Sequence, residues 1–346
     1  MASHQTRARR VTAALIEPHE RAAADTSAAH TSGVPAGARG RRRTWSAYAR
    51  MGRLVRYENF IGVPIALTLM PWATVRSGRT ALLVVLVQLA FVGFCCATGA
   101  FDDVQGYRDG TDRQNYEASD ETGLRSMWRK PLLTGDVTDA QAVRFAWSAT
   151  AFGIVMTVLA WLAAGRPWWF LPAYLAVAFF SVQYSYGLKF SYRGGQELVL
   201  FTSFFAAVFF PYTLVTGTAT ATATVVALVA GLWVMQISSF SNSHDVEGDR
   251  ASGRRTVAVR TTPEGNLRFI VALFIGDWIL LAVSLARGWI SLWYLPGLLL
   301  VLGVQVVQLR EGVVRRRYLA ARHLGWTAIR LAAVTFIVVG IGANWL

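Results

Sequence analysis

The sequence predicts an all-α, polytopic membrane protein. Of its 346 residues, 54% are hydrophobic and only 16% are charged. Several runs of about 20 residues carry almost no charge, which is the length an α-helix needs to cross a hydrocarbon core of about 30 Å. The Arg and Lys residues gather in the N-terminal segment and in alternate connections between these runs, as they do in proteins that cross a bilayer several times.

Residues 1–46 differ in composition from the rest of the chain. They mix Ala, Ser, Thr, Gly and Arg, end in a basic run around Arg41, and contain no apolar stretch long enough for a signal peptide. We expect a disordered, basic, cytoplasmic tail that orients the protein and contacts anionic membrane lipid. Residues 47–346 then form one transmembrane domain.

Nine apolar runs follow the tail, and each is a candidate transmembrane helix. They cover about 57–75, 81–101, 141–163, 168–187, 197–216, 223–241, 267–286, 289–309 and 325–345. The connections after the second, sixth and eighth runs each hold about five Lys or Arg residues, whereas the connections on the other side hold only Arg76, Arg79, Arg166 and Arg287. Because positively charged connections stay in the cytoplasm, we expect the N-terminus inside and the C-terminus outside. The net charge of +14 therefore reflects membrane topology and does not argue for nucleic acid.

A first acidic cluster follows the second apolar run. The segment F-D-D-V-Q-G-Y-R-D-G-T-D contains Asp102, Asp103, Asp109 and Asp112. If the helix continues past the membrane, Asp102 and Asp109 share one face, because seven residues are close to two turns. Carboxylates so placed can hold Mg²⁺ through one or two oxygens and leave its other positions to water and phosphate.

A second acidic cluster follows the sixth apolar run, in residues 242–256. Asp245 and Asp249 are four residues apart, which places them on one helical face, and Asn242 lies one turn earlier. An even number of crossings separates the two clusters, so both fall on the cytoplasmic face. Two acidic faces that meet over one diphosphate would let Mg²⁺ ions bridge its oxygens.

Basic residues near both clusters are candidates to bind the remaining charge of a diphosphate. They are Arg125, Arg129, Lys130, Lys189, Arg193 and Arg250. The ordinary alternative is that such a residue pairs with a neighbouring Asp and only orients a helix end.

The second cluster resembles the second aspartate-rich motif of the UbiA superfamily of intramembrane prenyltransferases. In that motif an Asp or Asn precedes D-x-x-x-D by three residues, and R-x-x-G-x-x-T follows. The matching residues are Asn242, Asp245, Asp249, Arg250, Gly253 and Thr256.

Three further motifs occur in the order typical of this family. The first cluster is similar to the N-D-x-x-D motif in the form found in dihydroxynaphthoate prenyltransferases, with Asp103, Gly110, Thr111 and Asp112. Residues 129–135 resemble the R-P-L-x-x-G element, and residues 184–197 resemble a Y-S-x-x-x-x-K loop that leads to a G-E pair. Together the motifs and the nine runs cover nearly all of residues 50–346.

The chain departs from the family pattern in the first motif. Asp102 stands where the family usually has Asn, and Gly106 stands where it usually has the second Asp. The first metal site must then take its ligands from Asp102, Asp109 or Asp112, or bind metal more weakly.

The resemblance implies nine transmembrane helices in one bundle around a central cavity, with a cytoplasmic cap of loop helices. It implies Mg²⁺ as cofactor and an isoprenyl diphosphate as substrate. The residues it suggests as catalytic are Asp103, Asp245, Asp249 and Lys189; those for binding substrate are Arg125, Arg129, Lys130, Tyr184, Arg193, Asn242 and Arg250; and those for metal are Asp102, Asp103, Asp109, Asp112, Asp245 and Asp249.

The implied reaction ionises the allylic C–O bond and forms a carbocation in a water-poor pocket, where aromatic faces stabilise it. Four aromatic residues are expected near the reacting end: Trp147, Tyr184, Tyr186 and Phe240. Capture of the cation by an aromatic or quinone-precursor acceptor gives a prenyltransferase, and capture by the chain's own double bonds gives a terpene cyclase. A cation-coupled transporter is a third interpretation, but it would place its acids near the midplane on broken helices. The sequence carries no indication of the oligomeric state.

Three other polar residues are candidates for function. His244 is the one histidine near the second cluster, while Glu58 and Asp277 lie within apolar runs. Polar groups at membrane depth mark functional sites or bond one helix to another, and the sequence does not distinguish these cases.

Overall fold

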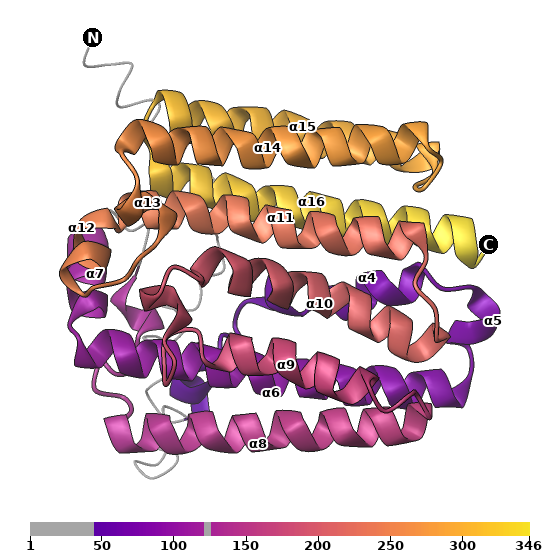
Figure 1. The fold of residues 1–346 in the computed structure, drawn as a ribbon, viewed down its shortest axis with the longest axis horizontal. Helices are drawn as coiled ribbons and strands as arrows, with labels where there is room; N and C mark the ends of the chain where they lie inside the picture. Colours follow the sequence, from indigo (N-terminus) through magenta and orange to yellow (C-terminus); the bar gives the residue numbers. More distant parts are fainter. Residues whose placement is uncertain (1–44, 121–125) are drawn as a thin grey trace, which may run out of the picture.

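The computed structural model describes residues 45–120 and 126–346, and every regular element within them is a helix. The long helices run roughly along one common direction and form a single bundle (Figure 1). Most of the predicted tail, and the candidate residue Arg125, lie outside the described residues.

Seven of the described helices are long and apolar enough to cross a membrane. They are α6 (Gly78–Arg108), α8 (Asp139–Ala164), α10 (Gln196–Thr216), α11 (Ala221–His244), α14 (Pro263–Ala286), α15 (Leu295–Leu309) with the flanking turns η4 (Leu292–Tyr294) and η5 (Arg310–Val314), and α16 (Tyr318–Asn344). Seven of the nine apolar runs therefore fold as membrane-length helices. The chain is an integral membrane protein.

The other two runs form shorter helices, so membrane-length helices are confirmed for seven of the nine predicted spans, and the remaining two spans stay a prediction. The run at 57–75 is divided into η1 (Tyr57–Phe60), α4 (Gly62–Thr68) and α5 (Trp72–Val75). Pro71 lies at the break between α4 and α5, where it has no N–H to continue the helix. The run at 168–187 contains only the 13-residue helix α9 (Phe170–Val182).

Small residues bring the long helices close together. A Cβ on Gly93 of α6 would lie 2.9 Å from the backbone of Gly153 in α8, and a Cβ on Gly231 of α11 would lie 2.8 Å from a backbone oxygen of Phe201 in α10. Helices in membranes associate through such close backbone contacts, because lipid gives no hydrophobic drive between them.

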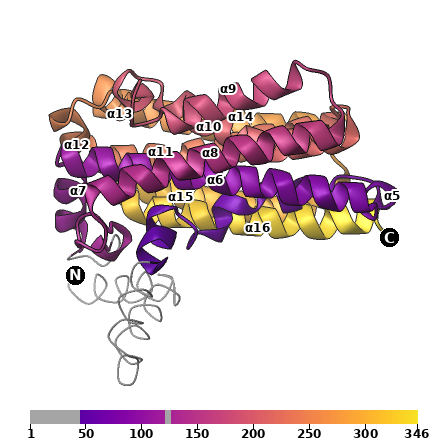
Figure 2. The ribbon, with the colours of Figure 1, turned by 90° about the horizontal axis from the view of Figure 1, so that it is seen from below.

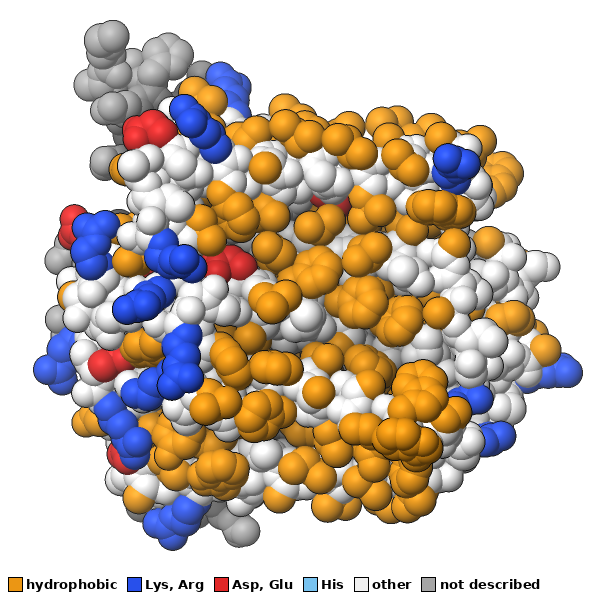
Figure 3. All heavy atoms as spheres, in the orientation of Figure 1, with side chains coloured by type: hydrophobic (Ala, Val, Ile, Leu, Met, Phe, Trp, Pro, Cys, Tyr) orange, Lys and Arg blue, Asp and Glu red, His pale blue; other side chains and the backbone are white. Residues whose placement is uncertain are grey.

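Three short helices lie together at one end of the bundle. They are α7 (Thr111–Asp120), α12 (Val246–Ala251) and α13 (Val257–Arg260), and the C-terminus lies at the opposite end (Figures 1 and 2). Lys and Arg side chains crowd the surface at the end that carries α12 and α13, whereas hydrophobic side chains form a broad band along the helices (Figure 3).

A buried polar network joins α11, α14 and α15 in the interior. The Oδ2 of Asp277 accepts hydrogen bonds from the indole of Trp233 at 2.7 Å and from the amide of Gln305 at 2.8 Å. Gln236 donates to the same oxygen at 3.3 Å. Asp277 therefore links α14 to α11 and α15. Of the two roles that the sequence left open for it, this is the bond from one helix to another.

Candidate active site

A cavity of about 360 Å³ opens where α7 and α12 lie. Its outer part is lined by charged and amide side chains: Arg53, Arg56, Asp102, Asp112, Asn115, Arg129, Lys130, Asn242, Asp245, Asp249, Arg254 and Arg322. Its inner part is lined mainly by apolar side chains of α6, α10, α11 and α16, among them Phe91, Leu200, Phe204, Val234 and Trp326. The cavity thus has a polar outer end and an apolar interior.

Lys130 connects two carboxylates of the first acidic cluster. Its ammonium lies 2.7 Å from Oδ1 of Asp103 and 2.7 Å from Oδ1 of Asp112. Arg53 donates to the same oxygen of Asp103 at 2.6 Å, while Oδ2 of Asp103 is buried and has no hydrogen-bond partner among residues 45–120 and 126–346. Asp103 is 1% exposed and does not line the cavity. It therefore binds Arg53 and Lys130 without being part of the cavity wall itself.

Asp102 has polar partners from three separate segments of the chain. Its Oδ1 accepts a hydrogen bond from Ser185 at 2.7 Å and lies 3.2 Å from the guanidinium of Arg254. Its Oδ2 lies 3.6 Å from Arg53. Arg254 follows α12, so this ion pair joins the second acidic cluster to the end of α6.

The pKa values of the charged groups reflect this pairing. Burial lowers the pKa of Lys130, but the carboxylates of Asp103 and Asp112 outweigh it and hold the pKa above its ordinary value. For Arg254, burial is likewise outweighed by Asp102, so that its pKa is also raised. Burial raises the pKa of Asp112 to about 6; the ammonium of Lys130 opposes this rise, and the Asp103 carboxylate adds to it. Both cations therefore stay charged at neutral pH.

The second acidic cluster lies at the junction of α11 and α12. Asn242 is in the last turn of α11, Asp245 ends that helix, and Asp249 lies in α12, where its backbone N–H donates to the carbonyl of Asp245 at 2.8 Å. The amide oxygen of Asn242 accepts a hydrogen bond from Gln196 at 2.7 Å, which fixes its side chain. All three residues line the cavity.

The two clusters meet through α7 and α12. A Cβ on Gly248 of α12 would overlap the side-chain amide of Asn115 in α7, so this glycine lets the Asn115 side chain lie directly against α12. Gly253 then adopts a φ of +81°, a left-handed conformation that glycine takes without strain, immediately before Arg254. The chain turns there so that Arg254 reaches Asp102.

The structure gathers some of the predicted site residues and separates others. Those that line the cavity are Asp102, Asp112, Arg129, Lys130, Tyr184, Asn242, Asp245 and Asp249. Arg193 and Arg250 are exposed and do not line it. Lys189 also lies outside the lining, with its ammonium 5.4 Å from the ring centre of Tyr192.

Asp109 caps the turn after α6 and does not line the cavity. Its Oδ1 accepts from the backbone N–H of Thr111 at 3.0 Å and from the Thr111 hydroxyl at 2.6 Å, and Tyr192 donates to Oδ2. Although burial raises the pKa of Asp109, these hydrogen bonds hold it below its ordinary value. We expected Asp102 and Asp109 to lie on one helical face and to contribute to one site, but only Asp102 lines the cavity.

The predicted aromatic residues are only partly at the cavity. Tyr184 lines it, whereas Trp147 and Tyr186 pack against Phe101 and Phe240 packs against Phe274. The aromatic rings that line the cavity besides Tyr184 are Phe91, Phe94, Tyr116, Phe204 and Trp326. His244 is exposed and does not line it.

Sequence reasoning missed Arg53, Arg56, Arg254 and Arg322, all of which line the cavity. Arg254 directly follows the matched Gly253, so its place in the motif was a usable signal. Arg53 lies at the border of the predicted tail and has a φ of 60°, and nothing in the sequence indicates that it reaches Asp103.

The lining residues fit a divalent cation better on one side than on the other. Within residues 45–120 and 126–346, no three His, Cys, Asp or Glu side chains cluster as a metal site. On the first side, a Cβ on Gly106 would lie 2.5 Å from Cγ of Asp112, so the Asp112 carboxylate occupies the space above this glycine. That carboxylate is bound to Lys130. On the second side Asp245 and Asp249 supply two carboxylates, and Mg²⁺ requires only one or two besides phosphate and water.

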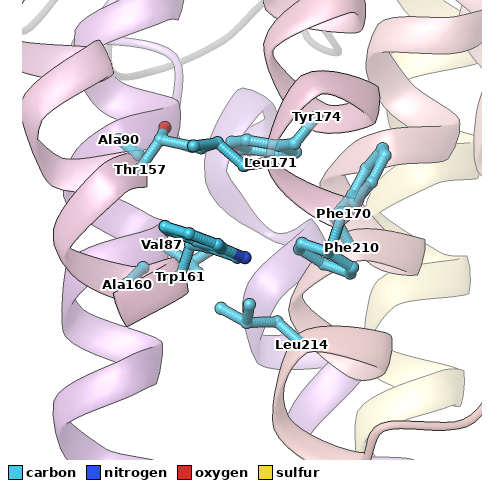
Figure 4. Close-up of a pocket in the computed structure, with 10 residues that line it drawn as sticks. All are labelled: Val87, Ala90, Thr157, Ala160, Trp161, Phe170, Leu171, Tyr174, Phe210 and Leu214. Atoms are coloured by element: carbon cyan, nitrogen blue, oxygen red, sulfur yellow. The ribbon is translucent and has the colours of Figure 1, made fainter. Parts of the chain in front are cut away.

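A second void, between α6, α8, α9 and α10, is not a ligand site. It has a volume of about 10 Å³ and is lined almost entirely by apolar side chains such as Trp161, Phe170 and Phe210 (Figure 4). The hydroxyl of Thr157, its one aliphatic alcohol, donates to the carbonyl of Gly153 at 2.8 Å. A void of this size holds at most one water.

Comparison with known proteins identifies similar sequences and folds. A model of the UbiA prenyltransferase family matches residues 61–326. No curated protein matches the chain by sequence. The fold is similar to a structure described for digeranylgeranylglyceryl phosphate synthase, with a TM-score of 0.61 and 16% identity over 86% of this chain and 99% of that one.

The fold is also similar to a UbiA homologue from Archaeoglobus fulgidus. The form bound to DMAPP and Mg²⁺ gives a TM-score of 0.56 with 16% identity, over 86% of this chain and 99% of that chain. The form bound to GPP and Mg²⁺ gives 0.57 with 15% identity, over 87% of this chain and 100% of that chain. At such identities the likeness concerns the fold.

Proposed function

The chain belongs to the UbiA prenyltransferase family, and on this premise we propose that it is a Mg²⁺-dependent membrane enzyme that ionises an isoprenyl diphosphate and transfers the prenyl group to an aromatic or lipophilic acceptor. The observation that carries the proposal is the division of the cavity. Cations and carboxylates from five separate segments line its outer end, and apolar side chains line its interior. This arrangement suits a molecule with a charged head and a hydrocarbon tail.

The chain's own cations bind the diphosphate in this proposal. Lys130, Arg129 and Arg254 line the outer end, and the carboxylates of Asp102, Asp103 and Asp112 hold Lys130 and Arg254 in fixed positions. Fixed cations stabilise charge that develops on a leaving group without reorganisation at the moment of reaction. When the allylic C–O bond breaks, its electron pair stays with the diphosphate oxygen, which faces these groups.

Asp245 and Asp249 would hold Mg²⁺, with Asn242 beside them. Mg²⁺ supplies further neutralisation of the diphosphate oxygens when it is bound. Asp102 and Asp112 face the same cavity and are the remaining candidate ligands from the first cluster. Asp103 and Asp109, which do not line the cavity, act by positioning Arg53, Lys130 and the loop at Thr111.

The proposed carbocation forms in the inner part of the cavity. Phe91, Phe94 and Phe204 line this part and offer aromatic faces to a cation. An acceptor then donates an electron pair to the allylic carbon and loses a proton, which gives the prenylated product. If no acceptor enters, a double bond of the same chain supplies the electron pair, and the cyclised cation then loses a proton to give a cyclic hydrocarbon or is captured by water, with loss of a proton, to give an alcohol.

The active end is proposed to face the cytoplasm. The basic side chains gather at this end of the bundle, as the positive-inside rule requires of a cytoplasmic surface. The C-terminus, at the other end of the bundle, is then outside.

Product analysis tests this function and separates its two forms. Purified protein in nanodiscs, with Mg²⁺ and dimethylallyl, geranyl, farnesyl or geranylgeranyl diphosphate, should release pyrophosphate. Release that requires an added aromatic acceptor, with a prenylated product, supports the transferase. Release without acceptor, with a cyclic hydrocarbon or alcohol, indicates the cyclase. No release from any substrate, together with ion flux in liposomes, would favour a transporter and refute the enzyme.

A further inference from the structure

Another cavity, of about 30 Å³, lies beyond the inner part of the large cavity of about 360 Å³. The two cavities share only two lining residues, Asn59 of η1 and Phe204 of α10. We propose that Phe204 divides a single channel into two sections and thereby sets the longest prenyl chain that the enzyme accepts. This inference rests on the proposed function, and it names the residue that selects the substrate.

The lining of α11 shows that the two cavities belong to one channel. Asn242, Ser238 and Val234 line the large cavity, and Ala230 and Val226 continue the same series into the small one. These residues are four apart, so they follow one face of the helix. At 1.5 Å per residue the series extends roughly 24 Å from Asn242, and about half of that length belongs to the large cavity.

Helices α10 and α16 continue in the same way. On α10, Val199 and Ser203 line the large cavity, Phe204 lines both, and Val208 lines the small one. On α16, Trp326 lines the large cavity and Ala333 the small one. Three helices therefore pass from one section to the next in register, and the side chain of Phe204 lies at the junction.

The second section is apolar and closed at its far end. Val208, Val226 and Phe336 are each 1% exposed, and the indole of Trp233 is fixed by its hydrogen bond to Asp277. Its one acidic side chain, Glu58, accepts a hydrogen bond from Nε of Arg330 at 2.7 Å, so its charge is paired. Such a lining suits hydrocarbon.

The present volume of the second section is too small for an isoprene unit. A cavity needs about 10–15 Å³ to hold one water, so a cavity of about 30 Å³ holds two or three water-sized groups, fewer than the five carbon atoms of an isoprene unit. A prenyl chain whose diphosphate lies at Lys130 and Asp249 must then end at Phe204. Removal of the Phe204 ring would join the two sections and let the chain continue along α11 toward Val226.

The test compares substrate length profiles. The kcat/KM for pyrophosphate release is measured with the four allylic diphosphates for the wild type, for Phe204→Ala and for the milder Phe204→Leu. We expect both variants to shift preference toward a chain at least one isoprene unit longer, by roughly tenfold in the ratio of kcat/KM, as for pocket changes of a few methylenes. Phe204→Leu carries the test if Phe204→Ala does not fold.

Two controls assign the effect to the channel. Phe205 is the next residue on α10, lines neither cavity and stacks on Phe209, so Phe205→Ala should lower stability but leave the length profile unchanged. Adding Ala230→Leu to Phe204→Ala refills the second section and should restore the wild-type profile.

The outcomes separate the two proposals. If the wild type turns over at least one substrate and both Phe204 variants keep its length profile, the inference is wrong and the proposed function stands. If the wild type releases pyrophosphate from none of the four, the proposed function fails and the inference falls with it.

Discussion

Lys130 is the residue on which the charge balance of the cavity depends. It is 3% exposed and lies within 2.7 Å of two carboxylates, one of which, Asp103, is itself 1% exposed. Burying these charges is costly, and their mutual attraction compensates for it only while all partners are present. In the proposed function, the same ammonium binds the diphosphate from a position that these carboxylates fix.

Lys130→Met should therefore destabilise the protein as well as weaken substrate binding. Removal of one partner from a buried ion pair costs about 3–5 kcal/mol, because an uncompensated charge is left behind. Thermal unfolding in detergent should show a lower midpoint, and Lys130→Arg, which keeps the charge, should lose less. An unchanged midpoint for Lys130→Met would show that these contacts contribute little to stability.

Gly106 provides a second prediction at this scale. Because its Cβ would lie 2.5 Å from Cγ of Asp112, Gly106→Ala should displace that carboxylate from Lys130 and weaken binding of a non-hydrolysable prenyl diphosphate analogue. Gly276→Ala is the matched control, since a Cβ there meets no atom within 4 Å and alanine favours the helix. Equal affinity for the analogue in the two variants would contradict the proposal that Asp112 holds Lys130 in position for the diphosphate.

The helices that carry the site are held together by polar contacts in the interior. Asp277 accepts hydrogen bonds from α11 and α15 on one oxygen, and Trp233, one of its donors, also lines the second section of the channel. The Asp277 carboxyl group serves as a hydrogen-bond acceptor between helices, and it does not line the large cavity.

Asp277→Asn and Asp277→Leu should separate the roles of charge and hydrogen bonding. Asparagine keeps an acceptor for the indole and the amides, whereas leucine leaves several buried donors without a partner. Interhelical hydrogen bonds in membranes average about 0.6 kcal/mol, so Asp277→Leu should cost on the order of 1–3 kcal/mol and Asp277→Asn less. Thermal unfolding measures both. Equal loss in the two variants would indicate that the charge itself matters.

At the scale of the whole molecule, the sequence was most informative where a structure depends on local patterns. Hydropathy located seven membrane-length helices, and the spacing of Asp245 and Asp249 indicated two carboxylates that the structure places at one cavity. The membrane class, the family and the all-helical fold followed from such patterns.

Other features depend on contacts between distant segments, and the sequence could not supply them. The pairing of Arg53 with Asp103, and of Arg254 with Asp102, requires α6, α12 and the N-terminal segment to meet in three dimensions. Lys189, Arg193 and Arg250 have the right charge in the right motifs but do not line the cavity. Composition alone also predicted long helices at 57–75 and 168–187, where the structure has shorter ones.

In the proposed function, Asp245 and Asp249 hold the Mg²⁺ that activates a prenyl diphosphate at the polar end of the cavity. Mg²⁺-dependent pyrophosphate release by Asp245→Asn and Asp249→Asn tests it most directly, with Glu247→Gln as control, because Glu247 is an exposed carboxylate in the same helix as Asp249. We predict a loss of about 100-fold or more in each Asp variant, with folding retained, and no loss in the Glu247 variant. Equal rates in all three variants and the wild type would contradict the account.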